Sequence, residues 1–165
     1  MADGHIDAIP SKAAIAGHPI HPMLVPFPIA SLVGALVVDI VFWSTGDPFW
    51  ARAGVWLLLA GVITGAVAAV FGLADFLAHA RVRSLWAAWA HLIGNAAALL
   101  LAVWNIALRW GEPTAGVLPG GVVLSALVVL ILLFTGWLGG ELAFRHRIGV
   151  VSDAAPGHVA RPREL

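Results

Sequence analysis

The stretch "VLPGGVVLSALVVLILLFTGWLGGELAF", residues 117–144, decides the fold class, because Glu141 is its only ionisable side chain. A transmembrane helix needs about 20 consecutive, predominantly apolar residues. This stretch is therefore long enough to cross the hydrocarbon core of a bilayer. Toward the N-terminus, three more apolar stretches cover residues 23–43, 53–77 and 85–108. The sequence thus predicts a membrane protein with four transmembrane helices.

The composition of the whole chain agrees with a membrane protein. Of its 165 residues, 61% are hydrophobic and 11% are charged, whereas soluble domains have roughly half apolar and about 25% charged residues. The formal net charge is zero, which gives no basis for binding nucleic acid. The chain has no cysteine, and this excludes disulfides, thiolate metal sites and cysteine-ligated iron–sulfur clusters.

The connections between the four stretches are short and polar or rich in glycine and proline. They read "STGDP" (44–48), "HARVRS" (79–84) and "GEPTAG" (111–116). Short connections place consecutive helices antiparallel, so the predicted fold is an all-α, antiparallel four-helix membrane bundle. The predicted organisation is a polar N-terminal tail (1–15), a four-span membrane domain (16–151) and a disordered C-terminal tail (152–165).

The basic residues are distributed unequally between the two sides of this bundle. Arg52 and Arg109 lie on one side. The other side, which carries both termini, has Lys12, Arg81, Arg83, Arg145, Arg147, Arg161 and Arg163. Because loops rich in lysine and arginine stay in the cytoplasm, we predict that both termini are cytoplasmic.

The same topology brings seven ionisable residues, from the ends of all four spans, to the cytoplasmic end of the bundle. Two of them, His79 and His146, lie beside arginines at the interface, and the other five are His18, His21, Asp75, His91 and Glu141. At ~1.5 Å per helical residue, Asp75 lies roughly 9 Å inside Arg81, and His91 roughly 12 Å inside Arg83. An ionisable group at that depth is costly unless it is paired, protonated or bound to a ligand. These residues are therefore the candidates for a functional site.

Glycines accompany these residues on two spans. Four of them form one face of the second span, and they are Gly54, Gly61, Gly65 and Gly72. Small residues on one face let transmembrane helices approach closely. Three others, Gly136, Gly139 and Gly140, precede Glu141 and leave room for a close neighbour or a flat ligand. Each pair of spans starts with histidine and ends with glycine, an acid and histidine, which suggests a parallel internal repeat.

The segment "HPIHP", residues 18–22, places both of its histidines before proline. Proline biases the preceding residue toward extended geometry, and a polyproline-like segment would hold His18 and His21 roughly 9 Å apart. The prediction is a stiff strap that positions one histidine at a time. Pro26 and Pro28 suit the first turn of a helix, so the regular helix is expected to begin nearer Phe27 than Met23.

Several of these elements resemble one protein family. They are "GHPIHPMLVPFPIA" (17–30), Asp39, "GLADF" (72–76) and "GWLGGELAFRHRIGV" (136–150). Over roughly residues 16–151 the chain is similar to the bacterial membrane proteins grouped as domain of unknown function 2231. The resemblance implies a multi-pass, four-helix protein of the bacterial inner (cytoplasmic) membrane. It also implies a redox association, because the layout is similar to that of small haem-bearing membrane cytochromes.

The first functional hypothesis is a b-type haem site for electron transfer. Haem needs axial ligands such as histidine and an apolar pocket. We expect His91 and His21 as the axial pair, with His18 as the substitute for His21. Three arginines at the cytoplasmic rim would bind the haem propionates, and they are Arg81, Arg83 and Arg145. The expected partners are the lipid bilayer and a redox protein, and a second copy of the chain is a further candidate.

Two alternatives remain open on the sequence. One is a transition-metal site formed by His18, His21, His91, Asp75 and Glu141, since imidazole and carboxylate suit zinc, iron or manganese. The other is proton or solute transport without a cofactor, in which Asp75, Glu141 and His91 act as a relay and Asp39 continues the path toward the far side. No nucleophile–base pair and no phosphate-binding loop stands out, and the sequence leaves enzymatic activity open.

Each acid also has a purely structural interpretation. Asp75 could bond to His79 or to a tryptophan and fix the packing of two helices. Glu141 could pair with Arg145 one turn later. Asp39 lies near the far interface and is expected to be an acid at the end of a helix.

Overall fold

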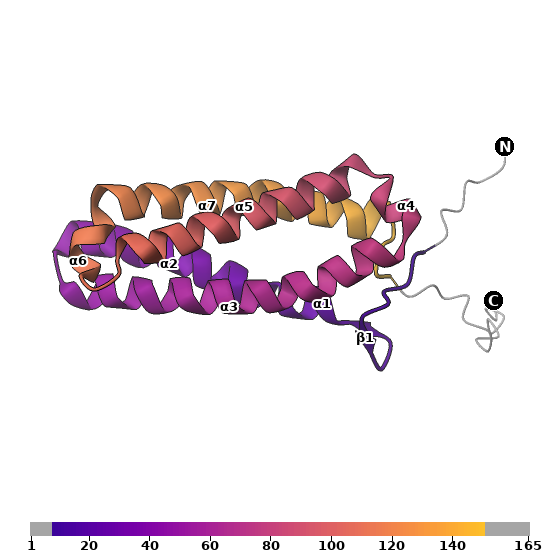
Figure 1. Ribbon diagram of the computed structural model, residues 1–165, viewed down its shortest axis with the longest axis horizontal. Coiled ribbons are helices and arrows are strands. Elements are labelled where there is room, and N and C mark those ends of the chain that lie inside the picture. Colours follow the sequence, from indigo (N-terminus) through magenta and orange to yellow (C-terminus); the bar gives the residue numbers. More distant parts are fainter. Residues whose placement is uncertain (1–7, 151–165) are drawn as a thin grey trace, which may run out of the picture.

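The computed structural model describes residues 8–150, in which four long helices lie side by side along the length of the molecule (Figure 1). They are α2 (Pro26–Thr45), α3 (Pro48–Ala78), α5 (Trp86–Leu108) and α7 (Val122–Gly140). With the short helical segments that adjoin them, these helices form four spans long and apolar enough to cross a membrane. The predicted four-helix membrane bundle is confirmed.

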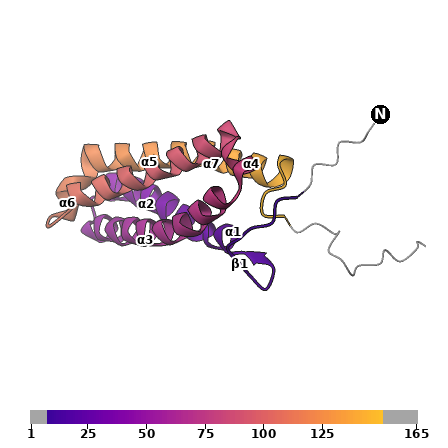
Figure 2. The same ribbon diagram turned by 45° about the vertical axis from the view of Figure 1, so that its right-hand side comes forward.

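Short elements connect and extend these helices. They are β1 (Ala14–Ile15), β2 (His18–Pro19), α1 (Ile20–Leu24), α4 (Ala80–Arg83), α6 (Pro113–Gly116), η1 (Val117–Gly121) and η2 (Glu141–Arg145). The end of the bundle that holds the β1–β2 hairpin, α4 and η2 is called the tail end below. The opposite end, which holds the 46–47 turn and α6, is called the loop end (Figure 2).

The antiparallel turn between α2 and α3 follows from its local sequence. Helix α2 ends at Thr45 and is capped by Gly46, whose φ of 68° is the left-handed conformation that glycine adopts without strain. The Asp47 side chain then accepts a hydrogen bond of 2.9 Å from the Phe49 amide and caps α3. Pro48 occupies the first turn of α3, where its missing amide hydrogen costs nothing. These features reverse the chain within two residues.

The described chain begins and ends at the tail end (Figure 1). The Ile9 amide donates to the Arg147 carbonyl at 3.0 Å, and the Gly149 amide donates to the Ile9 carbonyl at 2.8 Å. Part of the segment that the sequence assigned to a polar tail is thus packed on the bundle. The predicted disordered segment, 152–165, lies outside the described residues.

Three apolar clusters follow one another along the bundle. The cluster at the loop end contains Phe42, Ala51 and Val117. The middle cluster contains Leu32, Ala35, Leu58, Ala98, Ala102, Ile106 and Val128. The cluster at the tail end contains Ile9, Phe76, Val82 and Ala88. Between the middle and tail clusters lies a layer with polar side chains, and this layer holds the candidate site.

The outer surface of the bundle is also apolar. Trp56 is 73% exposed, Leu100 70% and Leu133 68%. Soluble monomers rarely expose large continuous apolar patches, whereas the lipid of a bilayer covers such a surface. The glycine face predicted on α3 is confirmed as the inner face, since Gly54, Gly61 and Gly65 are buried. A Cβ on Gly61 would lie 2.6 Å from Leu32 of α2.

The polyproline strap predicted at residues 18–22 is not observed. His18 instead belongs to β2, which pairs with β1 across a turn containing Ala16 and Gly17 with positive φ. His21 lies in the short helix α1. The hairpin satisfies backbone hydrogen bonds that a polyproline segment would leave to solvent. The regular helix begins at Pro26, which is near the expected position at Phe27.

Candidate functional site

His21 and His91 face each other between the middle and tail clusters. Their ring centroids are 6.4 Å apart, and their planes are nearly perpendicular at 83°. His21 comes from α1 and His91 from the first third of α5, and both side chains are half-buried. Two halves of the chain therefore each contribute one imidazole to the same place.

A backbone carbonyl fixes each ring. The Nδ1 atom of His21 lies 2.8 Å from the Ala68 carbonyl oxygen of α3. The Nδ1 atom of His91 lies 2.9 Å from the Thr135 carbonyl oxygen of α7. Because a carbonyl only accepts hydrogen bonds, Nδ1 must carry the proton in both rings. In the neutral ring the lone pair is then on Nε2, which is available for a metal or for a donor.

A glycine makes room beside each ring. A Cβ added to Gly72 would lie 2.9 Å from Nδ1 and Cε1 of His21. A Cβ added to Gly139 would lie 3.2 Å from Cε1 of His91. Each glycine stands four residues after the carbonyl that holds the ring, and thus one turn along the same helix. The two halves of the chain therefore build the same arrangement of histidine, carbonyl and glycine.

The half of the site around His91 has an additional polar link. The Asn95 side chain donates to the His91 carbonyl at 2.7 Å. The Thr135 hydroxyl donates to the Asn95 amide oxygen at 3.3 Å. A Cβ on Gly94 would overlap the Thr135 methyl group. Helices α5 and α7 are thus locked together at the level of His91.

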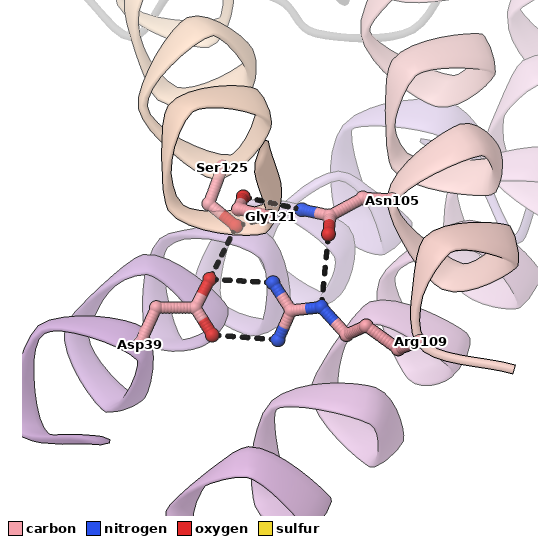
Figure 3. Close-up of polar contacts among 5 residues, drawn as sticks. All are labelled: Asp39, Asn105, Arg109, Gly121 and Ser125. Atoms are coloured by element: carbon pink, nitrogen blue, oxygen red, sulfur yellow. Dashed lines mark hydrogen bonds and ion pairs between the residues drawn. The ribbon is translucent and has the colours of Figure 1, made fainter. Parts of the chain in front are cut away.

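A second polar cluster lies at the loop end, where Arg109 and Asp39 form a buried ion pair (Figure 3). The guanidinium donates to Asp39 Oδ1 at 2.6 Å and to Oδ2 at 2.7 Å. The side chains of both residues are 0% exposed. The pair joins α2 to the end of α5 through two parallel charge-assisted bonds.

Three neighbours satisfy the remaining polar atoms of this cluster (Figure 3). Ser125 of α7 donates to Asp39 Oδ2 at 2.7 Å. Arg109 Nε donates to the Asn105 amide oxygen at 2.9 Å. The Asn105 NH₂ group donates to the Gly121 carbonyl and to Ser125, each at 2.9 Å. A buried ion pair persists only when its hydrogen bonds are complete, and this cluster meets that condition.

The ion pair corrects the sequence interpretation of Asp39 as an acid at the end of a helix near the far interface, because Asp39 is buried and paired with Arg109. Two features of the sequence are compatible with a buried pair. Asp39 is an acid inside an apolar span, and Gly54 is a small residue on the face of α3 that borders both charged groups. A Cβ on Gly54 would lie 2.7 Å from the Arg109 guanidinium and 3.0 Å from Asp39 Oδ1. We interpret the cluster as a structural clamp, because all its charges are engaged within the protein.

The family model described as "Predicted membrane protein (DUF2231)" matches residues 17–152. The chain belongs to this family. The matched region includes both facing histidines, their carbonyl and glycine partners, and the ion pair at the loop end. Neither a curated protein nor a solved structure matches the chain. The function of this member of the DUF2231 family must therefore be argued from its geometry.

Of the histidines predicted for the DUF2231 site, the structure brings His21 and His91 together and leaves His18 apart. His18 is exposed on the β1–β2 hairpin. The three predicted arginines are exposed at the tail end. Arg83 donates to the Leu77 carbonyl, and Arg145 pairs with Glu141 at 3.0 Å as the sequence suggested.

Asp75 does not join the histidine pair. Its Oδ2 accepts a hydrogen bond from the Ser11 hydroxyl at 2.6 Å. Its Oδ1 accepts from the amides of Lys12 and Ala13 at 2.7 and 3.1 Å. The expected bonds to His79 or to a tryptophan are not formed. Asp75 instead anchors residues 11–13, the segment that leads through the hairpin to His21.

The five residues predicted as a metal site are not assembled in this member of the DUF2231 family. Within residues 8–150, no three histidine, aspartate or glutamate side chains lie close enough to hold a metal ion. Asp75 is bonded to the N-terminal segment, and Glu141 is bonded to Arg145. Two imidazoles remain as the donor set of the site.

Proposed function

We propose that this DUF2231 protein is a b-type haem protein of the bacterial inner membrane, and that it transfers electrons with His21 and His91 as axial ligands. The observation that carries the proposal is the pair of facing imidazoles, each held by a backbone carbonyl on Nδ1. Histidines that bind metals almost always donate their other ring N–H to a carbonyl or carboxylate. Both histidines have that partner here.

The separation of the rings supports one metal between them. A metal–nitrogen distance of ~2.0 Å plus ~1.1 Å from Nε2 to the ring centre puts each centroid about 3.1 Å from a central ion. Two imidazoles on opposite sides of that ion would then have centroids about 6.3 Å apart. The observed centroid separation is 6.4 Å. An edge-to-face contact of two rings falls in the same range of centroid distances, so the spacing is compatible with one ion between the rings and the fixed Nδ1 atoms carry the argument.

The surroundings of the pair also suit a flat macrocycle. Gly72 and Gly139 place bare backbone next to the rings. Apolar clusters lie on both sides of the layer. Exposed arginines at the tail end could bind carboxylates of a haem edge. The chain has no cysteine for covalent attachment, so the haem would be held noncovalently, as b-type haem is.

Haem supplies one-electron chemistry to such a site, and it requires only two protein ligands. That requirement matches a donor set in which two imidazoles meet. A site of zinc or manganese would need further ligands from the protein. A relay through Asp75 and Glu141 is not favoured, because Asp75 accepts three hydrogen bonds from the N-terminal segment and Glu141 is paired with Arg145. The chain's own residues would orient the two axial nitrogens and exclude bulk water.

The test is purification of the full chain from haem-replete cells, followed by a reduced-minus-oxidised visible spectrum and iron analysis. We expect one haem per chain in the wild type. His21→Ala and His91→Ala should each abolish the bis-histidine spectrum. His18→Ala is the matched control and should retain it, because His18 is exposed on the hairpin. A colourless, folded wild-type protein would overturn the proposal.

A further inference from the structure

His79 lies at the tail end, where α3 ends and α4 begins, and its side chain is half-buried. Its Nε2 atom is buried without a hydrogen-bond partner, and it is the one side-chain nitrogen or oxygen of residues 8–150 in that state. A buried polar group in a native protein is almost always hydrogen-bonded, because an unpaired one costs free energy. This nitrogen is therefore a group that a bound molecule can satisfy.

The position of His79 relates it to the facing histidines. It stands seven residues after Gly72, the glycine beside the His21 ring. Seven residues are nearly two turns of an α-helix, so the two positions lie on the same face of α3. At ~1.5 Å per residue, His79 lies about 10 Å nearer the tail end than Gly72 does. A molecule that is bound by His21 and extends toward the tail end thus follows the face of α3 that leads to His79.

The two halves of the chain are related by an approximate two-fold rotation. His21 and His91, whose rings face each other, are 70 residues apart, and so are Asp39 and Arg109, which pair at the loop end. On α3 and on η1–α7, the equivalent residues that border these two sites are 67 apart, in the pairs Gly54–Gly121, Ala68–Thr135 and Gly72–Gly139. A residue that contacts its own equivalent lies at the rotation axis. Because the two contacts lie at different levels, the axis runs along the bundle, as it does in other parallel repeats of membrane proteins.

This symmetry orients a flat ligand that is bound between the rings. The rotation exchanges His21 and His91, so the line through the two axial nitrogens is perpendicular to the axis. The plane of a haem is perpendicular to that line, and it therefore contains the axis and stands along the bundle. One edge of the macrocycle then faces the tail end. A haem carries both propionates on one edge, and the exposed arginines favour the tail end for that edge.

The reach of a propionate matches the position of His79. One metal–nitrogen bond of ~2.0 Å and six further bonds that each advance ~1.2 Å place a propionate oxygen about 9 Å from the iron. A hydrogen bond of about 2.9 Å extends that reach to about 12 Å. The iron would lie at the level of the ring that Gly72 borders, and His79 is about 10 Å farther along. Nε2 is therefore within reach of a propionate.

We propose that His79 donates a hydrogen bond from Nε2 to a propionate of the haem in the proposed function, on which this inference rests. The arginines at the rim are exposed, and water weakens their bonds to a carboxylate. The Nε2 atom of His79 is buried, so its charge-assisted bond is screened less. This bond fixes the propionate edge at the tail end, and it thereby fixes the rotation of the haem about its two axial ligands.

The test compares two iron porphyrins that differ in their carboxylates. The full chain is produced in haem-depleted cells and titrated with ferric haem or with iron etioporphyrin, which has no propionates. His79→Ala should weaken the binding of haem by roughly tenfold, the lower end for a bond to a charged group. It should leave the binding of iron etioporphyrin unchanged. His79→Gln keeps a donor and should recover most of the haem affinity, and the exposed His18 provides the control variant His18→Ala, which should change neither affinity.

The outcomes separate this inference from the proposed function. An equal loss of affinity for both porphyrins in His79→Ala would show that His79 supports the fold rather than the propionate, and would overturn the inference. An unchanged affinity for haem would overturn it too, and in both cases a bis-histidine spectrum of the wild type would leave the proposed function intact. A wild type that binds no haem would overturn both. Resonance Raman spectroscopy gives a second readout, because the propionate-bending band should shift in His79→Ala while the bis-histidine spectrum persists.

Discussion

His21 and His91 occupy equivalent places in the two halves of the chain, and their rings meet at 83° with centroids 6.4 Å apart. The support of each ring is equivalent too. The Ala68 carbonyl accepts a hydrogen bond from the His21 ring, and Gly72 leaves space for that ring. The Thr135 carbonyl and Gly139 do the same for His91. Each half of the chain thus contributes one imidazole with the same support, as the proposed haem with its two equivalent faces would require.

The glycine beside His21 should be sensitive to the smallest substitution. Gly72→Ala puts a methyl group 2.9 Å from ring atoms, and the ring cannot withdraw without losing its carbonyl. We expect roughly tenfold weaker haem retention, as for other partners of metal-bound histidines. Haem content after dialysis against apomyoglobin measures it. Gly136→Ala is the control, since its Cβ would meet no atom within 4 Å. Equal losses in the two variants would refute the steric explanation.

Thr135 is expected to position His91 through its backbone carbonyl rather than through its hydroxyl. Thr135→Val keeps the carbonyl that holds His91 and removes the bonds that the hydroxyl donates to Asn95 and to the Leu132 carbonyl. The loss of stability should be about 0.6 kcal/mol, the average for such bonds between membrane helices. Haem content should not change. A variant that folds but loses its haem would show that the hydroxyl acts on the ligand.

Asp75 is expected to position His21 through the N-terminal segment. Asp75→Ala removes the acceptor for the Ser11 hydroxyl and for the amides of Lys12 and Ala13. Hydrogen exchange of those two amides should accelerate, and haem retention should fall by roughly tenfold. Asp75→Asn keeps one carbonyl oxygen as an acceptor and should recover most of the retention. Unchanged amide exchange in Asp75→Ala would contradict this role.

The ion pair at the loop end should dominate the stability of the bundle. Asp39→Ala leaves the Arg109 charge buried and unpaired, which should cost about 3–5 kcal/mol. The double variant Asp39→Leu/Arg109→Leu removes both charges and should be more stable than Asp39→Ala. Unfolding in mixed detergent micelles provides the measurement. Glu112→Gln, an exposed change at the same end, should have no effect. A double variant less stable than Asp39→Ala would contradict the charge explanation.

The number and the approximate limits of the spans could be predicted from the sequence, because the length of an apolar helix is set by the thickness of the bilayer. The pairing of His21 with His91 was also predicted, since the topology leaves both at one end and at similar depth. The cytoplasmic orientation of that end stays a prediction from the basic residues.

The partners of the site residues could not be predicted. Every residue carries a carbonyl, so nothing in the sequence marks Ala68 and Thr135 as acceptors. The pairing of Asp39 with Arg109 depends on how α2 and α5 are rotated about their axes. Helices that are apolar on all sides carry little information about rotation. Asp75 was assigned to the wrong partner because its real partners are largely backbone amides of the N-terminal segment.

The central claim is that His21 and His91 bind opposite faces of one haem, and electron paramagnetic resonance of the ferric protein tests it most directly. Two axial imidazoles with nearly perpendicular planes should give a strongly anisotropic low-spin signal. That signal should convert to high spin in His21→Ala and in His91→Ala, and persist in His18→Ala. A high-spin signal in the wild type, or a low-spin signal that survives His91→Ala, would contradict the account.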